Sequence, residues 1–218
     1  MNLVPVFLSL QIAGTATLIV TILGLPLAYL LAIKSFRGKN IIESLLALPM
    51  VLPPTVLGYY LLVLLGRNSL FGAWLKASFG ISLVFTKAGA ILAVVAVIFP
   101  LLVRTAQAGF EQLDQDLLSI ATTLGASSFT TFWRLAIPMA WKAVISGIML
   151  AFTRGMGEFG ATLMIAGSIP GKTQTLSLAI YEAVQSGDKV QANRLVALIS
   201  ILTFLVLWWT NKNIKNRI

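Results

Sequence analysis

The segment 114-DQDLLSIATTLGASSFTTFWRLAIP-138 is an amphipathic stretch between two long apolar runs, and it decides how the whole chain is interpreted. Asp114 and Asp116 open it, at a position where the dipole of a helix favours negative charge. Apolar residues then recur at helical spacing, at Leu117, Ile120, Ala121 and Leu124. Gly125 ends this predicted helix.

A second short helix is predicted directly after Gly125. Its N-cap is Ser127 or Ser128. Its aromatic side chains are Phe129, Phe132 and Trp133. Pro138 then opens the next apolar run. From these residues alone, the bent amphipathic pair is either an interfacial helix that rests on lipid or a docking element for a soluble partner.

The composition is that of an integral membrane protein. Of the 218 residues, 58% are hydrophobic and 11% are charged, and the mean hydropathy is +0.92. Soluble domains contain about 25% charged residues. We therefore expect an all-α integral membrane fold, because helices satisfy their own backbone hydrogen bonds in lipid. Nothing in the sequence marks a second domain, so residues 1–218 are expected to form one domain.

Cys and His are both absent, which removes several classes of function. Disulfides, thiol chemistry, imidazole catalysis and most zinc or haem sites are excluded. We therefore predict no catalytic residue, no metal and no cofactor. The net charge of +9 does not indicate nucleic acid binding, because the cations lie at the ends of apolar runs, where they meet lipid headgroups.

Five apolar runs are long enough to cross a bilayer, which requires about 20 residues. The predicted spans are residues 7–34, 44–66, 84–106, 138–167 and 193–212. If the C-terminus is cytoplasmic, nine Lys and Arg residues at the ends of the spans and in the loops face inward and six face outward. This bias fits the positive-inside rule. We therefore expect the N-terminus outside, and residues 113–137 in the cytoplasm.

The stretch 167-GSIPGKT-173 is close to a nucleotide-binding P-loop but does not match its pattern. The motif G-x-x-x-x-G-K-[ST] would require a glycine at position 166, where the chain has Ala166. A P-loop also follows a buried strand, whereas the residues before Gly167 finish an apolar run. The chain is therefore not expected to bind ATP itself.

Residues 113–137 resemble the coupling loop of ABC-transporter permeases, whose pattern is E-A-A, three residues, Gly, nine residues, then I-x-L-P. With Gly125 as the glycine, nine residues follow and 135-LAIP-138 stands at the final position. The first triplet departs from the pattern, because 119-SIA-121 lacks the glutamate. The resemblance implies that a cytoplasmic ATPase binds this coupling segment at Ala121, Leu124, Gly125, Ala126, Phe129, Trp133 and Pro138.

Two further stretches narrow the resemblance to the permease subunits of bacterial molybdate transporters. They are 47-ALPMVLPPTVLGYYLLVLLGRN-68 and 153-TRGMGEFGATLMIAGSIPGKT-173. Tungstate and sulfate permeases are close relatives of that group. The resemblance implies a type I ABC importer permease fold in a bacterial cytoplasmic membrane. It further implies a homodimer, two ATPase subunits that hydrolyse ATP, and an extracytoplasmic oxyanion-binding protein, so the chain is a transporter subunit and not an enzyme.

Arg154 and Glu158 lie four residues apart within the fourth apolar run. Each costs about 2.5–3.5 kcal/mol near the bilayer centre, so neither is expected to face lipid. The pair is either an ion pair that locks this helix against its neighbours or a contact for the passing anion that rearranges with the gate. Other residues of the predicted spans either serve packing or line the translocation path, namely Pro53, Pro54, Gly157 and Gly160.

Two other classes of function stay open at this point. A proton-coupled secondary anion carrier would use Arg154 and Glu158 as its relay. Such carriers commonly show inverted repeats, which this sequence lacks, and they need no docking segment. A membrane enzyme would lack the His or Cys usual at an intramembrane nucleophile or metal site, although serine with lysine could still serve.

Overall fold

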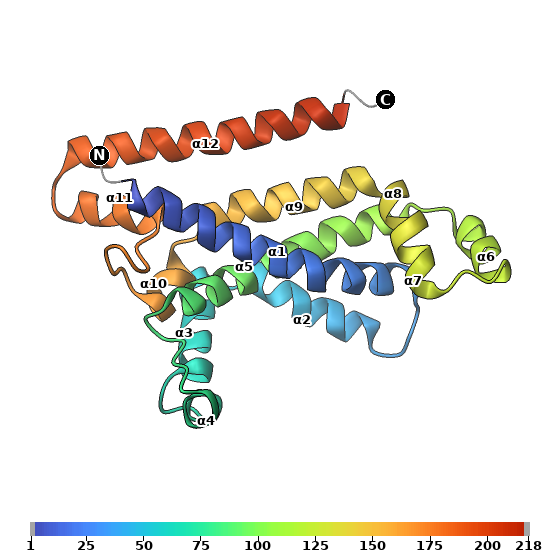
Figure 1. Ribbon diagram of the computed structural model, residues 1–218, viewed down its shortest axis with the longest axis horizontal. Helices are drawn as coiled ribbons and strands as arrows, with labels where there is room; N and C mark the ends of the chain where they lie inside the picture. The colour runs from blue at the N-terminus through green and yellow to red at the C-terminus, as the bar shows by residue number, and fades with distance from the viewer. Residues whose placement is uncertain (1–2, 216–218) are drawn as a thin grey trace.

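A computed structural model describes residues 3–215, and all of the regular secondary structure in that range is helical (Figure 1). The helices are α1 (Val4–Ile33), α2 (Lys39–Val51), α3 (Pro54–Leu65), α4 (Leu70–Phe79), α5 (Lys87–Glu111), α6 (Gln115–Thr123), α7 (Ser128–Thr131), the π-helical turn η1 (Phe132–Ala136), α8 (Ile137–Met139), α9 (Trp141–Met156), α10 (Gly160–Ala166), α11 (Leu176–Gln185) and α12 (Lys189–Lys215).

Three helices are long and apolar enough to cross a membrane by themselves: α1, α5 and residues Lys189–Thr210 of α12. Two further candidate spans are bent. Helices α2 and α3 meet at 112°, and Ser128–Met139 meets α9 at 82°. If each bent pair counts as one span, the described residues contain up to five spans, in agreement with the number of predicted runs. The predicted run 138–167 is divided between α8, α9 and α10.

Two consecutive prolines cause the bend between α2 and α3. A residue that precedes proline is pushed towards extended backbone. Accordingly, Leu52 has ψ 139° and Pro53 has ψ 137°, and both lie outside the helices. Pro54 then begins α3, where its missing N–H costs nothing because the first N–H groups of a helix have no partner within it.

Helix α5 is the centre of the fold and packs against α1, α9 and α10. Its fully buried side chains include Ala93, Val94, Ile98, Leu102, Val103 and Ala106. Small residues let the neighbouring helices approach closely. A Cβ added at Gly109 of α5 would overlap the Cβ of Ala143 on α9. Close van der Waals packing of this kind drives helix association in lipid, where apolar burial alone supplies little driving force.

A polar network fixes α2 against α5 near the end of the molecule that carries the coupling segment. Arg104 Nη2 donates to the backbone oxygen of Glu43 at 2.9 Å, and its Nη1 lies 3.5 Å from Glu43 Oε2. Gln107, which is buried, donates from Nε2 to Glu43 Oε1 at 2.8 Å. Charge-assisted hydrogen bonds are stronger than neutral ones, so α2 is held to the core independently of α3.

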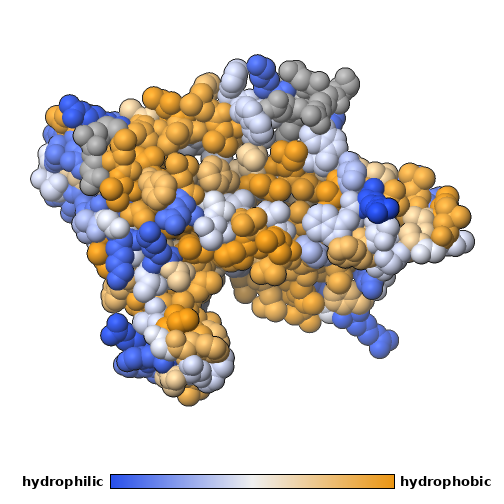
Figure 2. All heavy atoms as spheres, in the orientation of Figure 1, coloured by the Kyte–Doolittle hydropathy of each residue, from blue (hydrophilic) through white to orange (hydrophobic). Residues whose placement is uncertain are grey.

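The surface is largely apolar. Figure 2 shows hydrophobic residues over most of the visible face, with hydrophilic residues gathered towards its ends and edges. Helix α12 lies along the outside of the core (Figure 1), and only 11% of its apolar window is buried, against 50% for α5. An apolar helix this exposed must face lipid or another protein chain.

Candidate functional site

The coupling segment, residues 113–137, folds as α6, a glycine turn, α7 and η1. Asp114 caps α6 by accepting a hydrogen bond at Oδ1 from Asp116 N at 2.9 Å. After α6 the Ala126 N–H donates to Ala121 O and the Gly125 N–H donates to Thr122 O, both at 3.0 Å. These two bonds form a Schellman motif, which needs a left-handed residue at its centre. Gly125 has φ +88°, which explains why a glycine occupies this position.

One face of the coupling segment is anchored in the core. Leu118, Phe132 and Ala136 are buried. The Phe132 ring lies 5.1 Å from Tyr29 of α1 and 6.3 Å from Phe110 of α5, measured between ring centroids. Aromatic pairs at this distance add about 0.5–1.5 kcal/mol beyond their buried area. The segment is therefore fastened to both α1 and α5.

The segment stands at one end of the molecule (Figure 1), and its opposite face exposes apolar side chains. Leu124 is 82% exposed, Phe129 72% and Trp133 52%. Of the other residues predicted here, Gly125 and Pro138 are exposed, and Ala121 and Ala126 are half-buried. A contiguous exposed apolar patch on a projecting element marks a protein or membrane contact.

The segment ends in the π-helical turn η1, and the short helix α8 follows before α9. In η1 the Ile137 N–H donates to Phe132 O, five residues earlier, and Pro138 follows with no N–H to donate. The chain then bends by 82° at Ala140 before α9 begins. Turns of this type are frequent at functional positions, and this one carries the chain from the coupling segment towards a membrane helix.

Helices α3 and α10 meet at the second predicted site, which contains the residues predicted to line the translocation path. A Cβ added at Gly58 of α3 would lie 2.7 Å from Met164 Cβ and 2.8 Å from the Cα of Ala161 on α10, so these two helices touch along their backbones. Gly160 is buried, and a Cβ there would lie 3.0 Å from Pro54 Cβ. The structure therefore brings Pro54 and Gly160 together in one contact, which we call the α3–α10 pair. Pro53 and Gly157 are exposed beside it.

Arg154 and Glu158 lie across a break in the helix, and not along one continuous helical face. Helix α9 ends at Met156, and Glu158 stands in the turn before α10. The Arg154 Nη1 atom lies 2.8 Å from Glu158 Oε2, while Glu158 Oε1 accepts a hydrogen bond from Ala161 N at 2.9 Å. The side chain of Glu158 is 1% exposed and that of Arg154 is 39% exposed. One buried carboxylate thus ties the end of α9 to the start of α10.

The glycine-lysine loop, residues 167–173, is closed by its own hydroxyl group. Thr173 is fully buried, and its Oγ1 donates to Ala166 O and accepts from Ile169 N, both at 3.1 Å. The hydroxyl that a P-loop would direct to a nucleotide therefore holds this loop together. Beside it, Phe85 has φ +60° and its N–H donates to Ile165 O at 3.0 Å.

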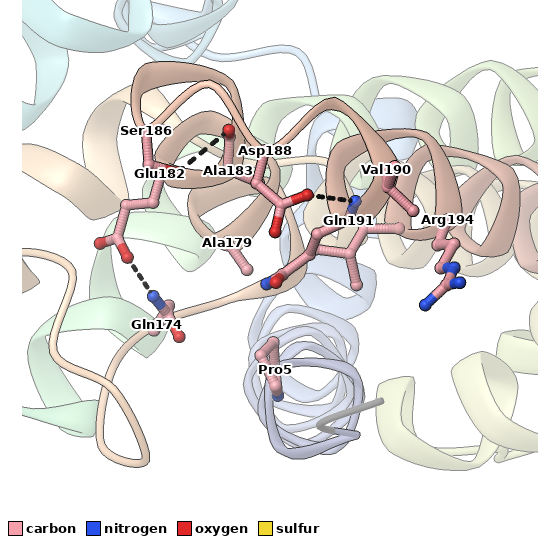
Figure 3. A pocket seen from close by; sticks show the side chains of 11 residues that line it. Pro5, Gln174, Ala179, Glu182, Ala183, Ser186, Asp188, Val190, Gln191 and Arg194 are labelled. Carbon is pink, nitrogen blue, oxygen red and sulfur yellow. Dashed lines mark hydrogen bonds between the residues drawn. The ribbon is translucent and has the colours of Figure 1, made fainter.

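A polar cavity of about 570 Å³ lies at the end of the molecule opposite the coupling segment, between α11, α12 and the start of α1 (Figures 1 and 3). Its charged lining residues are Glu182, Asp188 and Arg194. Glu182 accepts a hydrogen bond from Gln174 Nε2, and Asp188 accepts one from Gln191 N at 2.9 Å. The cavity forms where α11 packs on α12.

Comparison with known proteins identifies the family to which the chain belongs. Residues 24–214 match the family described as the inner membrane component of binding-protein-dependent transport systems. The chain belongs to this family. It is 38% identical over 222 residues to the molybdenum transport system permease ModB of Haemophilus influenzae, covering 100% of this chain and 97% of that protein. It is also 38% identical over 216 residues to ModB of Escherichia coli K12, covering 97% and 94% of the two chains.

A solved structure supports the fold of this permease. A chain of the inward-facing MetNI methionine ABC transporter superposes with a TM-score of 0.74 over 97% of this chain and 94% of that chain. The sequence identity is 15%, so the similarity shows the fold alone. The predicted all-α ABC importer permease fold is confirmed.

We expect replacement of Glu158 to destabilise the permease unless the new side chain can still accept a hydrogen bond. Glu158→Ala removes the acceptor for Ala161 N and the partner of Arg154. An unsatisfied buried donor costs about 1–3 kcal/mol, which lowers the melting temperature of a chain of this size by about 2–12 °C. Glu158→Gln keeps an acceptor oxygen and is expected to melt close to the unmodified protein. Thermal unfolding in detergent, followed by tryptophan fluorescence, measures both, and equal melting of the two variants would contradict the role of this carboxylate.

Proposed function

We propose that this permease carries molybdate into a bacterial cell across the cytoplasmic membrane, driven by ATP that is hydrolysed on separate subunits. The observation that carries the proposal is the 38% identity to permeases named for molybdenum transport, which extends over nearly the whole chain. The compact loop at residues 167–173 supports ATP binding by a partner, since Thr173 is engaged within the loop.

The coupling segment is the contact for the cytoplasmic ATPase. Its exposed residues, Leu124, Phe129 and Trp133, offer the aromatic and aliphatic anchors that dominate protein interfaces. In this arrangement the C-terminus is cytoplasmic and the N-terminus is outside. The polar cavity bounded by Glu182, Asp188 and Arg194 then faces outward, where its charges of both signs suit contact with an oxyanion-binding protein.

A second copy of the chain completes the passage. The α3–α10 pair leaves apolar and aromatic side chains of α3 uncovered, including Tyr59, Tyr60, Val63 and Leu64. We infer that these side chains meet a second copy and that the translocation path runs between the two. Pro53, Pro54, Gly157 and Gly160 lie at the breaks of the spans, where this path would open and close.

Transport follows from a change in the ATPase that the coupling segment transmits. When two ATPase subunits close on ATP, they displace the coupling segments of both copies. The displacement reaches α1 and α5 through the Tyr29, Phe110 and Phe132 cluster, and it reaches α9 through η1. Binding can switch the passage only if the ATPase holds the segment differently in its two states.

Uptake measured with and without the partner proteins tests the proposal. The permease is expressed in a bacterium that lacks its own molybdate permease, alone or with its cognate ATPase and binding protein. We expect molybdate uptake only with all three, with competition by tungstate and weak competition by sulfate. Equal competition by sulfate would contradict molybdate as the substrate. Uptake by the permease alone that collapses with the proton gradient would establish a proton-coupled carrier instead.

Substitution of the exposed face of the coupling segment tests the docking. Trp133→Asp places a charge in the contact, and loss of an interface anchor costs about 2 kcal/mol or more, which weakens ATPase binding by about thirtyfold. Gly125→Pro is expected to uncouple ATP hydrolysis from uptake by disrupting the Schellman turn, while Trp133→Phe serves as the control and keeps both. Co-purification of the ATPase and its substrate-stimulated hydrolysis are the measurements. Normal coupling in Trp133→Asp and Gly125→Pro would show that the segment does not dock.

Arg154, whose side chain is partly exposed, is proposed to contact the passing anion. The double variant Arg154→Gln with Glu158→Gln removes both charges and leaves no buried charge unpaired. If Arg154 contacts the anion, loss of charged hydrogen bonds lowers uptake by about ten- to a hundredfold, although the protein folds. The single Glu158→Gln variant, which keeps the cation, is expected to transport. Uptake by the folded double variant at the unmodified rate would assign the pair a purely structural role.

A further inference from the structure

An apolar groove of about 520 Å³ lies between α9 and α12, away from the α3–α10 pair and from the polar outer cavity. Six side chains line it, and all are apolar or aromatic: Met149 and Phe152 of α9, and Leu205, Val206, Trp208 and Trp209 of α12. Both helices belong to candidate membrane spans. The groove therefore opens at a depth where its occupant must be apolar.

The apolar lining of the groove selects its occupant. Water needs polar partners and is not held by an apolar lining. A flexible hydrocarbon chain fits the space and matches the lining.

Each of the two helices that form the groove carries a tryptophan with a lysine beside its ring. Both pairs lie towards the end of the molecule that bears the coupling segment. On α12, Lys212 follows Trp208 by one turn, and its Nζ lies 5.1 Å from the centroid of the indole ring. At the start of α9, the Lys142 Nζ lies 6.0 Å from the ring of Trp141. Both lysines are exposed. Tryptophan is enriched at the level of lipid headgroups, and basic residues beside it attract anionic lipid.

We propose that this groove binds an anionic phospholipid, with an acyl chain between α9 and α12 and the headgroup phosphate at Lys212. The bound lipid fills the space that the loose contact between α12 and α9 leaves. It also borders α9, which leads from the coupling segment to the break at Glu158. The site does not depend on which anion the permease carries.

Retention of lipid by the full-length permease tests the site. The protein is expressed in a bacterium whose membrane contains phosphatidylethanolamine and phosphatidylglycerol, washed extensively in detergent, and its lipids are quantified by mass spectrometry. We expect about one phosphatidylglycerol per chain, enriched over the ratio in the membrane. Leu205→Trp fills the groove and reduces retention to background. Met149→Trp fills the groove from the α9 side. It is used in place of Leu205→Trp if that variant does not fold.

A second pair of variants tests whether the headgroup phosphate lies at Lys212. Lys212→Gln removes one positive charge beside the groove and is expected to lower phosphatidylglycerol retention about fivefold. Arg37→Gln removes one charge from the exposed turn between α1 and α2 and is expected to leave retention unchanged. Equal losses of phosphatidylglycerol in these two variants would overturn the site, because lipid retention would then depend on the net charge of the protein and not on Lys212. Equal retention by Leu205→Trp and the unmodified protein would overturn it as well, as would disulfide cross-linking of two copies through Leu205→Cys in native membranes.

Discussion

The interior of a bilayer offers no hydrogen-bond partners, so a membrane helix can break only where the protein itself satisfies the freed backbone groups. Glu158 meets this requirement between α9 and α10. One of its oxygens accepts from Ala161 N, which would otherwise be an unpaired donor at the start of a helix, and the other faces the guanidinium of Arg154. The same carboxylate therefore permits the break and neutralises the cation beside it.

The contacts on either side of the breaks determine which parts can move. Helix α2 is bound to α5 by Glu43, Arg104 and Gln107, and α9 lies against α5 at Gly109. Beyond the breaks, α3 and α10 touch along their backbones at Gly58 and Ala161, and α10 also packs against α5. Under the proposed function, we therefore expect relative motion at Leu52–Pro53 and at residues 157–159, where the helices are interrupted.

The sequence predicts those features that have a local chemical cause. Five apolar runs are recognisable because spanning length and composition are properties of each run, and the turn at Gly125 is recognisable because a Schellman motif requires a left-handed residue. The break at residues 157–159 is not recognisable, because Arg154 and Glu158 have the same spacing in a continuous helix as across a turn. The polar cavity between α11 and α12 and the left-handed conformation of Phe85 are also not predicted. The cavity exists only where α11 packs on α12, and the Phe85 conformation accompanies a hydrogen bond to Ile165, 80 positions away along the chain.

The coupling segment combines an anchored face with an exposed one, and its small size makes the anchor necessary. Helix α6 has nine residues and α7 has four, whereas isolated helices shorter than about 12–15 residues are marginal in water. The segment therefore holds its shape because Leu118 and Phe132 are buried against the membrane helices. A force applied to Phe129 or Trp133 then displaces Tyr29 of α1 and Phe110 of α5 through Phe132, since packed interiors deform little. A segment that folded independently of the core could move without transmitting that displacement. Under the proposed function, the dependence of its fold on α1 and α5 is therefore what would couple the ATPase to the membrane spans.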